Sequence, residues 1–309
     1  MRAIGGPLSV GGETTYLEAH RFEANLTYRY LHADEIFKGD EYQPQYQQGG
    51  TNADITIHSW DLSLSYGLTK RVDLTLTLPF FYASADIVSN HFHQVSGGLG
   101  DLMFVPSAWI FNPDTHPNGN VSVGIGFRAP TGDSSVKDDQ GRPIDPALLP
   151  GFGAWGVVAQ LTAFQRLFDE TYFYLGGSYV FSTVGETDIS TPTNPNVHDS
   201  APDSYQGRGG FTWYFLPSQG LSLSFGSMIE GVPVENVITG ADYGFRRPGY
   251  AIYVEPGIAW SVHSTVLSLS GPVAVYRTRL PSTRDEALNA PGVGALANYQ
   301  IIFSISHFF

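Results

Sequence analysis

The sequence feature that most constrains the fold is the alternation of side-chain type over the last fourteen residues, 296–309. Successive side chains of an extended strand point to opposite faces, so residues two apart share a face. One face then carries Tyr299, Ile301, Phe303, Ile305 and Phe309, and the other carries Asn298, Gln300, Ile302, Ser304, Ser306 and Phe308. Because the first face is apolar and the second is mostly polar, such a strand separates an apolar medium from a polar one.

This terminal strand resembles the closing strand of bacterial outer-membrane β-barrels, which ends in an aromatic residue, here Phe309. His307 departs from the aromatic or aliphatic residue usual at its position. The resemblance implies that the strand end is read by the barrel-insertion machinery. An edge strand of a soluble β-sandwich is the alternative that this stretch alone leaves open.

Composition favours the membrane alternative. Only 15% of the residues are charged and 14% are aromatic, whereas soluble domains carry about 25% charged residues. No run of about 18 apolar residues is present, so no transmembrane helix is predicted, but the alternating strands of a membrane barrel escape that criterion. The net charge of −13 argues against a nucleic-acid partner. The absence of cysteine excludes disulfides and thiolate metal sites.

The same alternation recurs along the chain. The clearest case is residues 21–30, where an apolar face opposes a face that holds Arg21, Glu23 and Arg29. Further strands are predicted near 60–66, 71–82, 99–111, 121–130, 154–167, 171–183, 204–215, 221–231, 250–261, 265–278 and 296–309. These segments make about twelve strands, and most are long enough to cross a bilayer at barrel tilt.

The connections between these strands alternate between short and long. Short turns fall near 67–70, 112–120, 167–171, 216–220 and 261–265, and long segments near 31–53, 84–98, 131–153, 184–203, 232–249 and 279–295. Outer-membrane barrels have short periplasmic turns and long outer loops. We therefore expect an all-β, transmembrane, antiparallel up-and-down barrel with both termini periplasmic. It would be a single domain, 1–309, in which 1–14 form a short N-terminal periplasmic segment.

Three stretches resemble a family of bacterial outer-membrane barrels associated with the meta-cleavage pathway of phenol degradation. They are YGLTKRVDLTLTLPF at 66–80, SGGLGDLMF at 96–104 and GFRAPTGD at 126–133. The resemblance implies uptake of hydrophobic or aromatic compounds, and no binding residue is carried over from it. A structural role for the second motif remains open, because its glycines permit a bend and Asp101 can bind backbone or an arginine of the lumen.

Charged residues on the non-apolar faces are expected to line the lumen, because charge on the lipid face is costly. This set is Arg21, Glu23, Arg29, Asp61, Arg71, Asp73, Asp101, Arg128, Arg166, Arg208 and Glu255. One interpretation is that opposite charges pair and brace the wall. The other is an electrostatic constriction that selects permeants by charge.

Aromatic residues share these inward faces and suggest a path for an apolar solute. They are Phe81, Trp109, Phe164, Tyr172, Tyr174, Tyr214 and Tyr253. Packing beneath a loop that folds inward is the alternative explanation. Twelve strands enclose a lumen narrow enough for side chains and loops to block it, so a wide, nonspecific pore is not expected.

Catalytic and metal sites find little support. His91 and His93 share one side of an extended segment, but a metal site needs three or four ligands. His58 with Ser59 and His263 with Ser264 are sequence neighbours that point to opposite faces, which prevents proton transfer within either pair. We therefore expect a non-enzyme without cofactor or metal.

The function that these features predict is a porin-like channel in the outer membrane of a Gram-negative bacterium. It would pass small hydrophobic or aromatic solutes passively and contact membrane lipid and lipopolysaccharide. The alternative is a closed interaction barrel that presents its long acidic loops to a partner. The acidic runs, such as Asp138 with Asp139, are either plain solvated surface or sites where divalent cations bridge to lipopolysaccharide phosphates.

Overall fold

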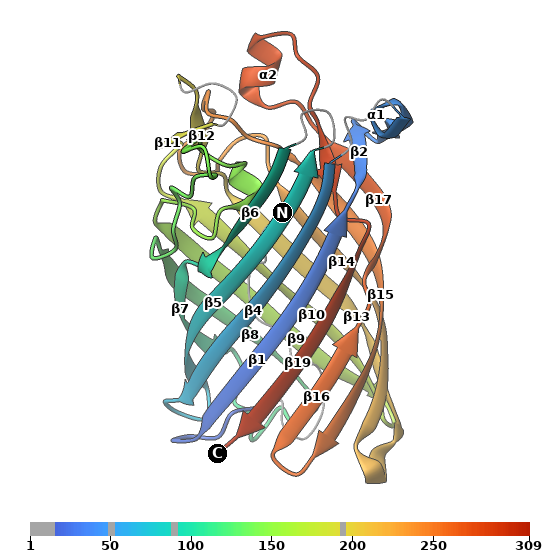
Figure 1. Cartoon of the computed structure of the whole chain (residues 1–309). Coiled ribbons are helices and arrows are strands. Elements are labelled where there is room, and N and C mark those ends of the chain that lie inside the picture. The colour runs from blue at the N-terminus through green and yellow to red at the C-terminus, as the bar shows by residue number, and fades with distance from the viewer. Residues whose placement is uncertain (1–15, 49–52, 88–91, 192–195) are drawn as a thin grey trace.

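The chain forms a closed antiparallel β-barrel with steeply tilted strands (Figure 1). The computed structural model describes residues 16–48, 53–87, 92–191 and 196–309. The expected N-terminal segment 1–14 lies outside this described part. No described helix is long and apolar enough to cross a membrane.

The wall consists of fourteen segments in one sheet. They are β1 (Phe22–Ala33), β4 (Ala53–Gly67), β5 (Val72–Ile87), β6 (Phe92–Leu99), β7 (Leu102–Trp109), β8 (Gly119–Ala129), β9 (Gly156–Phe168), β10 (Thr171–Ser182), β13 (Ser204–Leu216), β14 (Leu221–Val232), β15 (Gly249–Val262), β16 (Thr265–Ser270), β17 (Val273–Arg279) and β19 (Tyr299–Phe308). Two breaks reduce them to twelve wall strands, because β6 continues into β7 past Gly100 and β16 continues into β17 past Pro272. The predicted fold class is confirmed.

The ring closes between β1 and β19. Their antiparallel register runs from Glu23 opposite Phe308 to His32 opposite Tyr299. Every other wall strand pairs with its neighbour along the chain, which is the up-and-down topology that the alternating connection lengths predict.

Small elements occupy the connections. β2 (Glu35–Lys38), β3 (Glu41–Tyr42) and β18 (Val293–Leu296) form one small sheet, and β11 (Glu186–Ser190) and β12 (His198–Ser200) form another. The short helices are α1 (Pro44–Gln48) and α2 (Thr283–Ala287), with single 3₁₀ turns at Pro146–Leu148 and Pro217–Gln219.

The two ends of the barrel differ in the length of their connections. The end that carries the short turns and the C-terminus lies at the bottom of Figure 1, and we call it the turn end. The opposite end carries the long connections with α1, α2, β11 and β12, and we call it the loop end. The wall rises further at the loop end than expected, because β5 extends to Ile87 and β6 begins at Phe92 within the predicted connection 84–98. Most outward residues there, such as Ser84, Asp86 and His93, are polar, so the alternation of hydrophobicity no longer reveals the strand.

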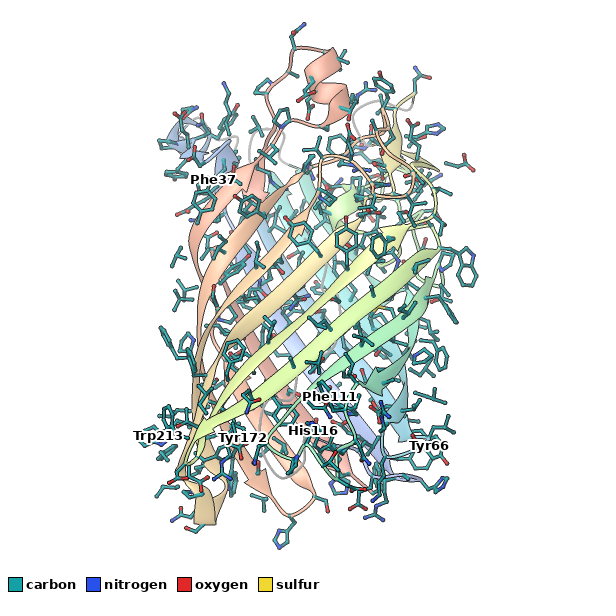
Figure 2. All side chains as sticks on the ribbon, turned by 180° about the vertical axis from the view of Figure 1, so that it is seen from behind. Phe37, Tyr66, Phe111, His116, Tyr172 and Trp213 are labelled. Carbon is teal, nitrogen blue, oxygen red and sulfur yellow. The ribbon has the colours of Figure 1, made fainter. Side chains whose placement is uncertain are left out.

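The two faces of the wall carry opposite chemistry, as β19 shows. Ile301 and Phe303 are 43% and 41% exposed on the outer surface, whereas the inward Ser304 and Ser306 are buried and accept hydrogen bonds from Asn25 of β1. An apolar outer face and a polar inner face are typical of a wall surrounded by lipid. Figure 2 shows Tyr66 and Trp213 on the outer surface near the turn end, where interfacial aromatic residues are expected.

The loop end is filled from inside by the connection between β8 and β9, residues 130–155, which we call the plug loop. Ile144, Leu148 and Leu149 of this loop are almost fully buried and belong to one hydrophobic cluster with inward residues of the wall, including Ile57 and Phe81. The barrel is therefore not an open tube at this end.

Candidate functional site

A cavity of about 360 Å³ lies beneath the plug loop, and we call it the loop-end cavity. Its walls are mostly apolar. They are supplied by Leu31, Ile57 and Ala85 of the wall strands, by Pro146–Leu148 of the plug loop, and by parts of the connections at 233–248 and 280–298. An apolar cavity of this size falls within the range of small-molecule sites.

The base of the plug loop is fixed by Asp101, the aspartate of the GLGD stretch. Its Oδ1 accepts a hydrogen bond from the Gly132 amide at 3.0 Å, and its Oδ2 accepts one from the Phe152 amide at 2.9 Å. Both stems of the loop thus bind the same carboxylate. A Cβ at Gly151 would lie 2.2 Å from the Gly132 carbonyl oxygen, so the stems cross at a distance that only glycine allows.

Asp101 also lies 3.7 Å from the Arg128 guanidinium. The two structural roles expected for this aspartate, binding of backbone and contact with a lumen arginine, are therefore both present. The GLGD stretch anchors the plug loop to the wall.

The tip of the plug loop is tied to two other elements through Asp145. Both of its carboxylate oxygens accept hydrogen bonds from Arg247, at 2.7 Å each, and its amide donates to the side chain of Gln94 on β6 at 3.0 Å. Burial alone would raise the pKa of Asp145, but the charge and hydrogen bonds of Arg247 outweigh burial and lower the pKa from its ordinary value of 3.8. The pair therefore remains ionised at neutral pH.

Two more arginines line the loop-end cavity. Arg246 donates hydrogen bonds to Asp242 at 2.6 Å and to Asn236 at 2.8 Å. Arg279, at the end of β17, donates to the backbone carbonyls of Arg247, at 2.7 Å, and of Ala295. The cavity is thus apolar over most of its surface, and its charged lining consists of three arginines together with Asp145 and Asp199.

A polar network joins inward side chains of four wall strands, β14, β15, β19 and β1. Glu230 of β14 accepts hydrogen bonds from Tyr253 at 2.8 Å and from Gln300 at 2.7 Å, and it pairs with Arg29 of β1 at 3.3 Å. All four side chains are buried. A second pair, Arg208 with Glu255 at 3.4 Å, braces the neighbouring wall strands. These contacts agree with the pairing interpretation of the lumen charges.

The turn end is narrowed by aromatic side chains. Tyr16 packs edge-on against Trp109 and Phe164, with ring centroids 4.8 and 5.6 Å apart, and its hydroxyl donates to the His116 carbonyl at 2.7 Å. Figure 2 labels His116 and Tyr172 at this end. Tyr16, which precedes β1, thus lies in the mouth of the barrel, which the sequence did not indicate.

The predicted lumen charges fall into three groups. Arg29, Asp61, Asp101, Arg128 and Glu255 are buried, and Arg208 nearly so. Glu23, Asp73 and Arg166 are partly exposed, whereas Arg21 and Arg71 are exposed at the turn end. Arg71 donates there to the carbonyls of Trp109 and Ile110. The role of this set in permeation remains a prediction.

The predicted aromatic path is split between the two ends. Phe81 and Tyr253 belong to the hydrophobic cluster beneath the plug loop, where the alternative of packing under an inward loop applies. Trp109 and Phe164 contact Tyr16. Tyr172 and Tyr214 pair edge-on at 5.8 Å, and Tyr174 is buried in the wall. A role in solute passage remains a prediction for these residues also.

Sequence reasoning missed most residues of the loop-end cavity. The dipeptide Arg246-Arg247 inside an otherwise acidic connection was a usable signal. Glu230 shares the inward parity of Ser222 and Ser224 on its strand and could also have been found. Leu148 carries no such signal, because an isolated apolar residue in a loop has no periodicity.

The histidines considered as metal ligands or catalytic groups do not converge. His91 lies outside the described residues, and His93 is hydrogen-bonded to Asp86 at 2.6 Å on the exposed surface. His58 is hydrogen-bonded to Tyr28 on the outer face, whereas Ser59 is buried on the inner face. The two side chains therefore point to opposite faces, as expected. Within the described ranges, no group of three or more histidine or acidic residues could hold a metal ion.

No protein-family model matches the chain, and no curated protein matches its sequence. Its fold is similar to solved outer-membrane barrels. An outer-membrane channel from Pseudomonas putida F1 aligns with a TM-score of 0.66 and 17% identity over 97% of this chain and 100% of that chain. The β domain of the Bordetella autotransporter BrkA aligns with a TM-score of 0.50 and 9% identity over 94% and 100%, respectively. The Ralstonia pickettii toluene transporter TbuX aligns with a TM-score of 0.45 and 9% identity over 95% of this chain and 90% of that chain. At such identities the first two likenesses establish the fold alone.

Proposed function

We propose that the chain is an outer-membrane channel for the passive passage of small hydrophobic or aromatic solutes. The observation that carries this proposal is the loop-end cavity, an apolar space of about 360 Å³ held inside a barrel wall. Water-filled pores are lined by polar side chains, so an apolar chamber at one mouth favours an apolar solute. The solute gradient supplies the driving force.

A route from this cavity toward the lumen passes Phe152. Phe152 lines the loop-end cavity and also a second cavity of about 40 Å³, whose walls include Asp61, Met103 and Arg128. Beyond it lies the polar interior of the barrel. A solute would therefore leave an apolar chamber through a constriction at which charged side chains are exposed to it.

The plug loop is the element that would have to move. Hydrogen bonds of Asp101 hold its stems, whereas the contacts of Asp145 hold its tip. Release of the tip alone would widen the cavity toward the loop end while the stems remain anchored. Because the stems and the tip are held by different residues, the tip can move while the stems and the barrel wall stay in place.

The Pseudomonas putida channel that shares this fold supports an outer-membrane location. We place the loop end outside the cell and both termini on the periplasmic side, with lipid and lipopolysaccharide around the apolar outer face. The resemblance of three sequence stretches to barrels associated with phenol degradation supports aromatic compounds as solutes. A non-enzymatic role is part of the same proposal.

Uptake into vesicles tests the proposal. The vesicles carry lipopolysaccharide in their outer leaflet, which slows spontaneous passage of apolar solutes, and the probes are 2-naphthalenemethanol and arabinose. We expect faster uptake of the aromatic probe than into empty vesicles. Ala85→Phe, which fills the loop-end cavity, should reduce this uptake, whereas Ser84→Phe on the outer face of the same strand should not. Uptake of neither probe above the empty-vesicle rate would contradict a channel and favour a closed barrel.

A further inference from the structure

We infer that the loop-end cavity binds solutes that combine an apolar body with one carboxylate, and that Arg279 receives the carboxylate. This inference rests on the proposed function and specifies its solute class. It is carried by the surroundings of Arg279, which lines the cavity at the end of β17 and is only 7% exposed.

Arg279 differs from the other two cavity arginines in its charged contacts. Within the described part of the chain, no carboxylate oxygen lies within 4.0 Å of its guanidinium, although the other cavity arginines, Arg246 and Arg247, each have one. Two of its five N–H donors bind the carbonyls of Arg247 and Ala295, and Nε has no partner. A buried cation that is held only by neutral carbonyls is costly unless an anion completes it.

The neighbouring charges do not supply that anion. Asp145 binds Arg247 through both carboxylate oxygens. The negative charge of Asp145 also acts on Arg279, but from beyond ion-pair distance. Asp199, the other carboxylate in the cavity wall, forms no described ion pair with Arg279. Among the described residues, no carboxylate forms an ion pair with Arg279, and the carboxylate of a ligand would complete one.

The shape of the cavity next to Arg279 suits a small planar group. Gly294 lies against the guanidinium, and a Cβ there would be 3.1 Å from Nε and 3.4 Å from Cδ of Arg247. Glycine thus keeps a side chain away from the arginine on this side. A guanidinium is planar and matches the two oxygens of a carboxylate, while Leu31, Ile57 and Ala85 offer apolar contact to the rest of the solute.

A second incompletely bonded arginine lies further along the proposed route. Arg128 borders the smaller cavity past Phe152, and its Nε and Nη2 have no hydrogen-bond partner. Its nearest carboxylate, Asp101, already accepts two backbone hydrogen bonds. An anionic solute that leaves Arg279 would therefore meet another cation at the constriction.

Binding to the full-length barrel in lipid nanodiscs tests this inference. The probes are 2-naphthoate and its neutral counterpart 2-naphthalenemethanol, which share one apolar body, and titration calorimetry against empty nanodiscs gives each dissociation constant. We expect the carboxylate to bind about tenfold tighter or more, as a charge-assisted hydrogen bond implies. Arg279→Gln should remove this preference and leave the affinity for the alcohol within about twofold.

Three further variants distinguish loss of the binding site from a folding defect. Gly294→Val keeps the arginine but fills the space beside it, so it should reduce the preference for the carboxylate while Arg279→Lys should retain part of it. Arg284→Gln removes a half-buried arginine of α2 outside the cavity wall and should change neither affinity. Heat-modifiable migration on a gel confirms that each barrel is folded.

The outcomes separate the two proposals. Equal binding of both probes to the wild-type barrel would overturn the inference and leave the proposed channel for apolar solutes intact. A preference that survives Arg279→Gln would also overturn it. Binding of neither probe would remove the cavity as a solute site and with it the basis of the proposed function.

Discussion

Arg247 donates two hydrogen bonds of 2.7 Å to Asp145, one from each terminal nitrogen to each carboxylate oxygen. The pair joins the tip of the plug loop to the connection between β14 and β15, across 102 positions of the sequence. Two-pronged pairs of this type are both strong and geometrically specific. Because both residues line the loop-end cavity, this ion pair holds the tip of the plug loop in its closed position.

Asp145→Asn should therefore loosen the plug loop. The substitution leaves Arg247 without its carboxylate and weakens the closed position by about 2 kcal/mol. We expect longer or more frequent open intervals in planar-bilayer recordings. Asp138→Asn, which removes a pair with Arg142 inside the same loop, is the matched control and should leave the open probability unchanged. Exchange of the two charges, Asp145→Arg with Arg247→Asp, should restore closure.

The same pair predicts how the plug responds to pH. The pKa of Asp145 is lowered in the folded protein, so its stabilising contribution is fully present above its ordinary value of 3.8 and is lost as the pH falls through the lower, folded value. Because the pair stays ionised between about pH 5 and pH 8, it should cause no change in conductance over that range. Opening of the plug loop should begin only below about pH 4. Asp145→Asn should abolish that acidic transition, and an unchanged transition in the variant would assign it to another group.

Tyr16 predicts the state of the turn end. Its ring fills the space between Trp109 and Phe164, so Tyr16→Ala should widen this mouth and raise the ion current through barrels whose plug is already loosened by Asp145→Asn. Tyr16→Phe keeps the ring and loses the hydroxyl, which donates to the His116 carbonyl, so it should have a smaller effect. Equal currents in all three barrels would show that the turn end does not limit conduction.

The network around Glu230 leads to a prediction about the stability of the barrel. Glu230→Leu removes the acceptor shared by Tyr253 and Gln300 and leaves Arg29 buried without a carboxylate, which should destabilise the barrel by about 3–5 kcal/mol. The double variant Glu230→Leu with Arg29→Met should recover most of that loss, because the unpaired charge is gone. Reversible urea unfolding in lipid vesicles measures both. Additive losses in the double variant would contradict a coupled network.

Arg128 predicts ion selectivity. It is 3% exposed beside the smaller cavity, so Arg128→Gln should shift the reversal potential in a salt gradient toward cations. Arg166→Gln is the comparison, because that side chain is 37% exposed near the turn end and should have a smaller influence. Unchanged conductance and reversal potential in both variants would remove these arginines from the conducting path.

The alternating strands could be predicted from sequence because lipid and lumen act on each residue separately. Ser304 faces the lumen and is polar, whereas its neighbour Ile305 faces outward and is apolar. The plug loop could not be predicted in this way, since Leu148 and Leu149 are buried by an inward fold of a connection without periodicity. The Asp145 to Arg247 contact joins two such connections, and no local pattern in either one identifies its partner.

The upper wall shows the intermediate case. Above the lipid band the outward residues of β5 become polar, as at Ser84 and Asp86, so the contrast between faces disappears while the strand continues. Backbone pairing with β4 and β6 maintains the strand there. A boundary drawn from hydrophobicity marks the edge of the lipid and not the end of the strand.

The seam between β1 and β19 has a consequence for assembly. All other wall strands meet a neighbour that emerges next to them in the chain, but Glu23 and Phe308 can meet only after the whole intervening sheet has formed. Until then the growing sheet carries two unpaired edges, and such edges recruit any strand they encounter. Contacts of this sequence separation also form slowly. The open sheet, whose two edge strands are still unpaired, is therefore the stage at which two copies of this chain would most readily pair with each other.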